Sequence, residues 1–324
     1  MNLRQRVRFY QQLAVLVRAG VPLRASLLRL KERIHDHQMA VLTQKINAGE
    51  TISDAFTSAG FSPFECHLVA AGERSAQLET VFDHLTEFWK RQQHMSQALR
   101  TPLYYPIIVL HLTIVVASLV DLMQVSPHVA VIHFFLRLAA LYLAGFVLYT
   151  VVRATWSSPL GQRFWLFVPI IGKALSSAYS YRWITVMRIE FSAGISMPNA
   201  VADAWRASGF VGSERLAREG EKILREGTEL SKLMQKWTRL PRDWIDFIET
   251  GEVSGALETA FINLEAEAAR TWTQTQQRMA EWVPKIVYFF ILLIIGWQII
   301  GLFEHAVLDP ISHAEDVIDK ASGN

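Results

Sequence analysis

Two glutamates stand in matching short motifs, Glu73 in Gly72-Glu73-Arg74-Ser75 and Glu252 in Gly251-Glu252-Val253-Ser254. Two carboxylates in equivalent places are what general acid–base catalysis would use. A glutamate that follows a helix-ending glycine can instead accept hydrogen bonds from the backbone N–H groups that start the next helix. We expect Glu73 and Glu252 to fix a helix corner or to contact a partner, and not to catalyse a reaction.

No other pattern offers a convincing reactive centre. Glu65-Cys66-His67 places metal-capable side chains side by side, but neighbours in a helix point about 100° apart and cannot share an ion without outside ligands. Gly172-Lys173-Ala174 lacks the earlier glycine and the hydroxyl residue of a phosphate-binding loop. The signatures of serine hydrolases, zinc proteases and dinucleotide-binding enzymes are also missing from the sequence. We therefore predict that the chain is not an enzyme and binds no cofactor and no metal.

The two glutamate motifs belong to an internal repeat. Residues 72–80 and 251–259 are identical at six of nine positions, and other landmarks keep nearly the same spacing, as shown by the pairs Gly20 and Gly194, Gly49 and Gly227, and Pro106 and Pro284. Each copy combines a polar region with an apolar segment. Within each motif we expect Gly72 or Gly251 to end one helix and Ser75 or Ser254 to cap the next, with Gly255 completing the second motif.

Both polar regions show helical periodicity. Phe9, Leu13, Leu16 and Val17 fall on one helix face in the first copy, and Trp183, Met187 and Phe191 do so in the second. Thr51 or Ser53 can cap the helix that follows Gly49. No stretch alternates with period two for long enough to predict a strand. The sequence therefore predicts an all-α protein with two homologous antiparallel helical bundles.

Three apolar segments account for a composition that is 51% hydrophobic and only 19% charged. The first (Leu103 to Val120) and the third (Ile286 to Phe303) each contain 18 residues without a charge, and the second (Val129 to Val152) is interrupted by His133 and Arg137. A membrane helix needs about 20 mostly apolar residues. We predict three transmembrane helices.

The basic residues predict the orientation. Residues 1–102 carry 13 of the 32 Lys and Arg residues and residues 153–285 carry 17, so the positive-inside rule places both polar regions in the cytoplasm. The expected order along the chain is a first cytoplasmic bundle (1–102), a first transmembrane helix (103–121), a short periplasmic loop (122–130), a second transmembrane helix (131–152), a second cytoplasmic bundle (153–282), a third transmembrane helix (283–304) and a periplasmic tail (305–324).

Several polar or turn-forming residues lie in or beside the predicted spans. Tyr105, Pro106 and Pro284 mark the membrane entries, and His111 and Arg137 lie within or near the hydrocarbon. Ionisable groups in a membrane are candidates for function, although Arg137 near the outer interface can also serve as a snorkelling anchor. Because Asp121 is expected at a similar depth, we predict that it pairs with Arg137.

The order and spacing of these features resemble a known family. Two homologous helical domains, three spans and paired Gly-Glu-x-Ser motifs look like the inner-membrane platform proteins of type II secretion and type IV pilus machines (GspF/PilC-like). The stretch Ala98 to Pro106 is similar to the family's Tyr-Pro entry to the first span, and Pro169-Ile170-Ile171-Gly172 is similar to its Pro-x-x-Gly. The sequence departs from the family at Ala76, where glycine is usual. Because the chain starts almost at the first domain, we expect a short member, like those of type IVb, conjugative or competence pili.

The resemblance implies a non-enzymatic scaffold in the bacterial inner membrane. Its partners would be a hexameric cytoplasmic assembly or retraction ATPase, major and minor pilins, inner-membrane assembly proteins and further copies of itself. The net charge of +2 gives no reason to expect a nucleic-acid partner. Two other classes of protein stay open. A transporter or channel subunit would need a polar path through the spans, and a membrane-anchored enzyme or signalling protein would need a nucleotide or metal site.

Overall fold

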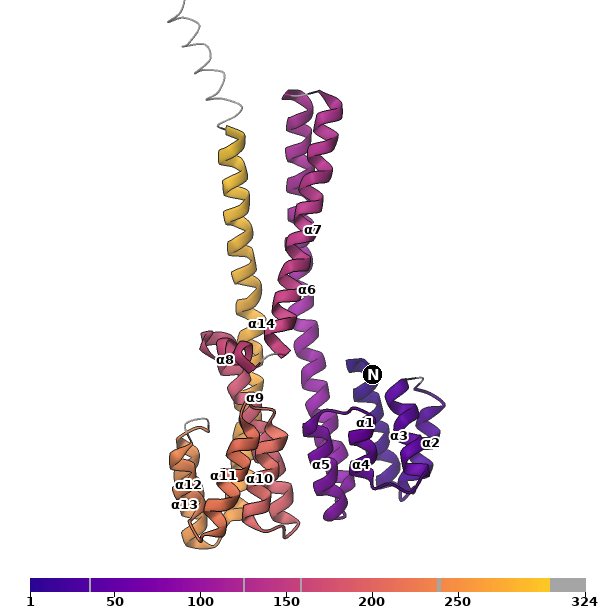
Figure 1. Cartoon of the computed structure of the whole chain (residues 1–324), viewed down its shortest axis with the longest axis vertical. Coiled ribbons are helices and arrows are strands. Elements are labelled where there is room, and N and C mark those ends of the chain that lie inside the picture. The colour runs from indigo at the N-terminus through magenta and orange to yellow at the C-terminus, as the bar shows by residue number, and fades with distance from the viewer. Residues whose placement is uncertain (35, 125, 158, 238–239, 304–324) are drawn as a thin grey trace, which may run out of the picture. The chain divides into compact units, whose positions relative to one another are not determined.

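The computed structural model describes the whole chain apart from residues 35, 125, 158, 238–239 and 304–324, and in the described part the secondary-structure elements are helices joined by turns (Figure 1). Within the described ranges there is no β-strand. The prediction of an all-α fold is confirmed.

The helices repeat in the same order along the chain. The first copy contains α1 (Leu3–Arg18), α2 (Leu23–Lys31), α3 (His37–Asn47), α4 (Ile52–Ser58), α5 (Pro63–Arg74) and α6 (Leu78–Gln124). The connector contains α7 (Pro127–Ser157) and α8 (Pro159–Phe167). The second copy contains α9 (Pro169–Ser192), α10 (Met197–Ser208), α11 (Ser213–Arg225), α12 (Leu230–Lys236), α13 (Asp243–Ser254) and α14 (Leu257–Phe303). Helices α4 and α12 have 7 residues each, α5 and α13 have 12, and α6 and α14 have 47. The repeat seen in the sequence is therefore a repeat of structure.

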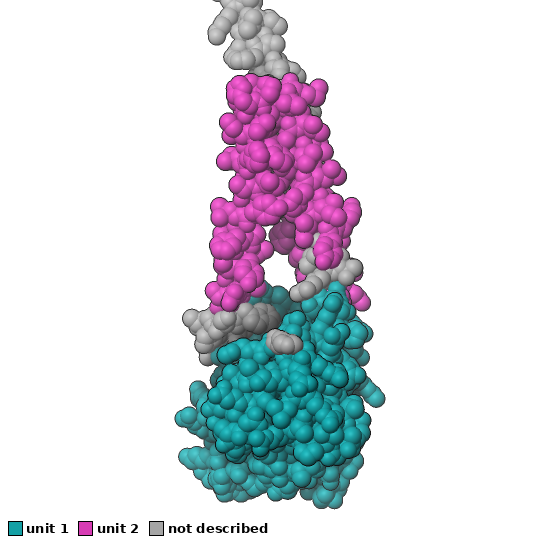
Figure 2. Space-filling view, turned by 90° about the vertical axis from the view of Figure 1, so that its right-hand side faces the viewer, with its two compact units in different colours: residues 1–97, 155–279 teal, residues 98–154, 280–324 magenta. Residues whose placement is uncertain are grey.

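The polar parts of both copies form one compact unit, residues 1–97 and 155–279, called unit 1 here (teal in Figure 2). The sequence predicts two bundles, but in unit 1 the copies share one continuous hydrophobic core. Phe88 of α6 stacks on Trp272 of α14 with the ring centroids 5.2 Å apart. Helix α5 of the first copy also packs on α9 and α10 of the second. Apolar faces that would otherwise meet water are thereby buried between the copies.

The predicted helix faces and turns of unit 1 are observed. Phe9 and Leu13 of α1, like Trp183 and Met187 of α9, are fully buried. Thr51 caps α4, because its side chain accepts the N–H of Asp54. The glycines that follow α1 and α9 have positive φ angles, as the left-handed position after a helix requires.

The second compact unit consists of residues 98–154 and 280–324, described as far as residue 303, and is called unit 2 (magenta in Figure 2). In it α6 and α7 lie side by side as an antiparallel hairpin (Figure 1). Phe135, Leu143 and Phe146 of α7 are each at least 60% exposed. Among the described residues, α6 and α7 are long and apolar enough to cross a membrane. Exposed apolar faces of this kind suit a lipid environment and not a soluble core.

The predicted third span coincides with the end of α14, which is helical through Phe303. That a third helix crosses the membrane stays a prediction, and residue 304 and the predicted tail (305–324) lie outside the described residues. Helix α6 continues without a break past residue 102, and α14 past residue 282. Pro106 and Pro284 therefore lie inside long helices, and that they mark the membrane entries stays a prediction.

Candidate functional site

The two Gly-Glu-x-Ser motifs form matching helix corners. Gly72 lies inside α5 and Gly251 inside α13, and both are buried. A Cβ atom on Gly72 would come within 2.6 Å of Val81 Cγ2, and one on Gly251 within 3.0 Å of the Ala260 Cβ. The expectation that these glycines end a helix is wrong. Their lack of a side chain lets α5 cross α6, and α13 cross α14, at close range.

The serines of the motifs lie at the ends of helices and not at their starts. Ser75 Oγ donates to the Ala71 carbonyl at 2.8 Å, and Ser254 Oγ donates to the Thr250 carbonyl at 2.6 Å. The predicted capping of the next helix is therefore wrong. A serine hydroxyl can bond a carbonyl four residues back as readily as it can cap a following helix.

The residue that closes each corner is one position beyond the serine. Ala76 has φ 54° and Gly255 has φ 70°. Ala76 is the one non-glycine residue with a positive φ in the described part of the chain. The left-handed conformation costs an L-residue about 1–2 kcal/mol, a cost that glycine escapes. The departure from glycine at Ala76 therefore leaves a strained turn in the first copy.

We expect Ala76→Gly to raise the free energy of unfolding by about 1 kcal/mol, because relief of the strain exceeds the added entropy of the unfolded chain. Gly255→Ala should lower it by about the same amount. An added Cβ at Gly255 meets no atom within 4 Å, so any change there reports the backbone alone. Thermal unfolding midpoints of the detergent-solubilised full-length variants check both signs. Equal effects of the two substitutions in the same direction would contradict the strain.

The paired glutamates hold the start of a helix in each copy. Glu73 accepts the N–H groups of Ile52 (2.9 Å) and Ser53 (3.1 Å) at the start of α4. Glu252 accepts those of Leu230 (2.6 Å) and Ser231 (3.0 Å) at the start of α12. A carboxylate at a helix N-terminus satisfies free N–H groups and interacts favourably with the helix dipole. The expected corner-fixing contact is thus observed, but with the helix that precedes the motif and not with the one that follows it.

A charged cluster joins the two copies inside unit 1. Arg74 of α5 contacts Glu190 of α9 and, at 3.2 Å, Asp203 of α10. Burial, and then the negative charge of Asp203, raises the pKa of Glu190 to about 8. Burial lowers the pKa of the nearby His67. Sequence reasoning missed this cluster. The available signal was a glutamate, Glu190, three and four residues after Met187 and Val186 on an apolar helix face.

A second buried carboxylate lies in the interior of the first copy. Glu65 is fully buried and accepts five hydrogen bonds, from Arg6, Tyr10, Trp89 and both the N–H and the hydroxyl of Ser62. Cys66 Sγ donates to the Phe61 carbonyl at 3.7 Å, whereas the charge of Asp203 acts on His67. The three neighbouring side chains thus have different surroundings.

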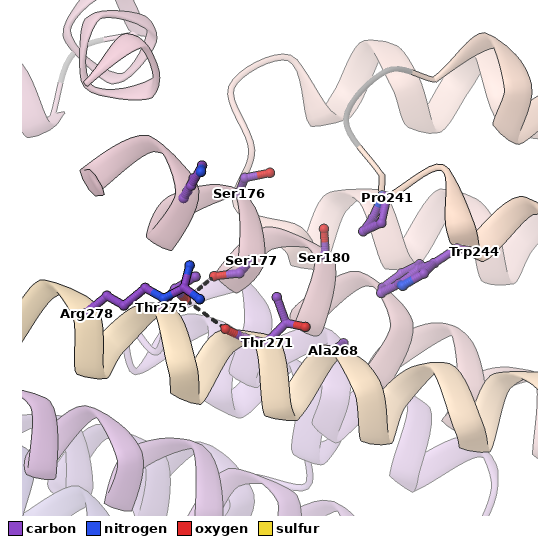
Figure 3. Close-up of a pocket in the computed structure, with 10 residues that line it drawn as sticks. Ser176, Ser177, Ser180, Pro241, Trp244, Ala268, Thr271, Thr275 and Arg278 are labelled. Atoms are coloured by element: carbon purple, nitrogen blue, oxygen red, sulfur yellow. Dashed lines mark hydrogen bonds between the residues drawn. The ribbon is translucent and has the colours of Figure 1, made fainter. Parts of the chain in front are cut away.

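The second copy has a groove where the first has this cluster. The repeat spacing pairs Trp89 with Ala268 and Glu65 with Trp244, and the smaller Ala268 leaves a hollow of about 270 Å³. Figure 3 shows the hydroxyls of Ser177 and Thr275 hydrogen-bonded in its wall, 2.7 Å apart. Lys173 and Arg278 also line the groove.

The polar residues of unit 2 are paired with one another. Arg137 Nη1 lies 2.9 Å from Asp121 Oδ2, and His133 Nδ1 lies 3.2 Å from the same oxygen. The predicted pair of Asp121 and Arg137 is confirmed. His111 contacts the Tyr142 hydroxyl at 3.2 Å. These contacts join α6 to α7.

The membrane-entry residues also have a defined contact. Pro106 has no N–H, so the carbonyl of Pro102, four residues earlier, loses its usual partner in the helix. The Tyr288 hydroxyl of α14 donates to that carbonyl at 3.0 Å. The rings of Tyr105 and Tyr288 lie 6.0 Å apart. Pro106 thereby leaves a backbone carbonyl of α6 free to accept a hydrogen bond from α14.

Fold and site together define a duplicated all-helical protein that has helices suited to a membrane and corners built from backbone-binding carboxylates. Residues 9–123 and 183–303 match the family described as type II secretion system (T2SS), protein F. The two matched segments correspond to the two copies of the repeat. The chain belongs to this family.

Relatives with described roles cover nearly the whole chain. It is 23% identical to the type IV pilus assembly protein TapC of Aeromonas hydrophila, over 95% of this chain and 81% of that protein. It is 22% identical to the type IV pilus assembly protein PilC of Myxococcus xanthus, over 91% and 78%. It is 24% identical to the type II secretion system protein F of Aeromonas hydrophila, over 95% and 86%.

Proposed function

We propose that the chain is a non-enzymatic platform protein of the bacterial inner membrane in a type IV pilus or type II secretion machine. The observation that carries the proposal is the family match to both copies of the repeat. In this proposal unit 1 is cytoplasmic and docks a hexameric assembly ATPase. Unit 2 receives pilin or pseudopilin subunits as they leave the bilayer.

The polar contacts of unit 2 favour this function over transport. A channel needs polar groups that face a water-filled path. Asp121, Arg137 and His133 instead bind one another, and His111 binds Tyr142. Paired groups of this kind suit a rigid helix hairpin that holds other proteins.

The test is co-purification from membranes of cells that express the full-length protein with its own assembly ATPase and prepilin. Both should remain bound in mild detergent, and the purified protein alone should show no nucleotide turnover. A reporter enzyme that is active only in the periplasm should be active when it is fused after residue 324. Turnover by the protein alone, or loss of both partners, would contradict the proposal.

Substitutions of the corner glutamates distinguish a structural role from a role in contacting the ATPase. We propose that Glu73 and Glu252 act structurally, so Glu73→Ala and Glu252→Ala should each lower the free energy of unfolding by about 1–2 kcal/mol. Below its melting temperature, each variant should still retain the ATPase. Glu79→Gln, at a side chain that is 45% exposed, is the matched control. A variant with unchanged stability and lost ATPase would assign the corner to a partner contact.

A further inference from the structure

Inside unit 1 one helix of the first copy is seated on two helices of the second. Helix α5 packs on α9 and α10, and its Arg74 binds Glu190 of α9 and Asp203 of α10. Near the other end of α5, the guanidinium of Arg182 lies 5.8 Å from the ring of Phe64. These contacts fix which residues face each other across the junction.

The repeat supplies a second, unused version of the same two surfaces. The counterpart of α9–α10 is α1–α2, and the counterpart of α5 is α13. Turn hydrogen bonds set the register, because Val21 donates to Leu16 as Ile195 donates to Glu190. Glu190 therefore corresponds to Leu16 and, by the same spacing, Asp203 corresponds to Arg29 and Arg182 to Arg8.

The α1–α2 surface is an open groove of about 450 Å³. Its lining includes Arg8, Gln12, Val15, Leu16, Arg29 and Arg33. Val15 is 57% exposed, and within the described part of the chain none of the three arginines has an ion-pair partner. An apolar floor with unpaired arginines at its rim suits an acidic helix with apolar side chains.

The outer face of α13 has that composition. Val253 is 86% exposed and Phe247 is 53% exposed, whereas Leu68, the counterpart of Phe247 in α5, is fully buried. Asp243 and Asp246 are exposed on the same helix. They replace Phe64 and His67 of α5. The face that α5 buries is thus left uncovered on α13, and it carries the charge opposite to that of the groove.

Three pairs of positions at the internal junction have complementary replacements, whereas the contact of Arg74 with Asp203 has none, because it becomes Val253 with Arg29. The ion pair of Arg74 and Glu190 becomes an apolar pair, Val253 with Leu16. Asp246 stands at the position of His67, and Arg29 stands at the position of Asp203. Asp243 and Arg8 replace Phe64 and Arg182.

We propose that α13 of one copy of this chain docks in the α1–α2 groove of a second copy and reproduces between chains the packing of α5 on α9–α10. The contact joins two different surfaces, so it is head-to-tail, and each chain offers one of each. The proposed contact between chains is inferred from the duplication of the chain. It goes beyond the proposed function, which names no contact surface.

Disulfide crosslinking of two differently tagged full-length chains in membranes tests the contact. Both chains carry Cys66→Ser, one carries Leu16→Cys and the other Val253→Cys. A disulfide forms where Cα atoms come within about 7 Å, so we expect a product that contains both tags. Leu28→Cys, on α2 outside the groove lining and 43% exposed, replaces Leu16→Cys in the control and should give at least ten-fold less product.

Charge reversal supplies the second arm. Arg29→Glu should lower the crosslink about ten-fold, and Asp246→Arg on the other chain should restore it, because like charges oppose docking and the exchanged pair attracts again. Arg8→Glu with Asp243→Arg repeats the test at the second pair if the first variant fails to fold. A product at the control level, a Leu16→Cys homodimer in place of the mixed product, or reversal without rescue would overturn the proposal. Loss of ATPase co-purification with the crosslink intact would count against the proposed function alone.

Discussion

Glu65→Ala is expected to lower the free energy of unfolding by about 3–5 kcal/mol, because it removes one member of a buried ion pair and leaves the other uncompensated. Arg6 lies 2.8 Å from the Glu65 carboxylate, and only 14% of its side chain is exposed. Tyr10 and Trp89 also donate to Glu65 at 2.7 and 3.1 Å, so several buried donors lose their acceptor together.

A conservative substitution gives a graded result. Glu65 is the acceptor in all five of its hydrogen bonds. A glutamine keeps one acceptor oxygen but replaces the other with an NH₂ group, whose two N–H donors would point at the same protein donors. The Tyr10 hydroxyl can rotate and accept one of these, whereas the Trp89 N–H cannot. Glu65→Gln should therefore cost less than Glu65→Ala, on the order of 1–3 kcal/mol.

Thermal unfolding of the full-length protein in one detergent measures both variants. At about 2–4 °C per kcal/mol for a folded unit of this size, Glu65→Ala should lower the midpoint by roughly 10 °C. Arg18→Ala is the control, because Arg18 pairs with Glu79 at the surface with 54% of its side chain exposed. Exposed pairs contribute about 1 kcal/mol or less. Similar losses from the surface and buried variants would refute the assigned role of Glu65.

The local part of this architecture could be predicted from the sequence. Turn glycines and a repeated nine-residue motif fix the duplication because they act through backbone geometry close to them in the chain. The stripe that includes Phe9 and Leu13 identifies a buried helix face for the same reason. The roles of residues within the motif do not follow from local pattern alone, because a serine such as Ser75 can bond at either end of a helix.

The contacts between the copies could not be predicted in the same way. Arg74 and Glu190 are 116 positions apart, and Arg74 and Asp203 are 129 apart. No local pattern indicates that α5 packs on the other copy, so the sequence alone predicts two separate bundles. Asp121 and Arg137 could be paired in advance because a short connector between two spans places them at a similar depth.

The charged junction between the copies should make unit 1 lose stability as the pH rises. The pKa of Glu190 is about 8 in the folded protein, because of burial and then of the Asp203 charge, against 4.5 for an ordinary glutamate. Between these two values the folded state holds one proton more than the unfolded state, so the free energy of unfolding falls with rising pH. The fall ends above the folded pKa.

The titration of nearby histidines determines the pH range in which the effect of Glu190 on stability can be measured. Burial lowers the pKa values of His67, which faces the same cluster from α5, and of His84 from their usual 6.5. These groups destabilise the protein below about pH 6.5, which is opposite in sign to the effect of Glu190. Above pH 7 both histidines are mostly neutral in the folded and in the unfolded state, so they contribute little. The window from pH 7 to pH 8 therefore reports Glu190.

In that window we expect the wild-type protein to lose about 1 kcal/mol, since one pKa unit corresponds to about 1.4 kcal/mol. Glu190→Gln keeps the shape and removes the titration, so its stability should change little from pH 7 to pH 8. Arg74→Met removes a cation that contacts Glu190. The pKa of Glu190 should therefore rise, and the loss of stability should occur at higher pH than in the wild-type protein. Denaturant unfolding of the full-length variants across this range is the measurement. A pH slope that survives in Glu190→Gln would place the titrating group elsewhere. A slope that only this variant lacks would assign the loss of stability to the ionisation of Glu190 at the junction between the copies.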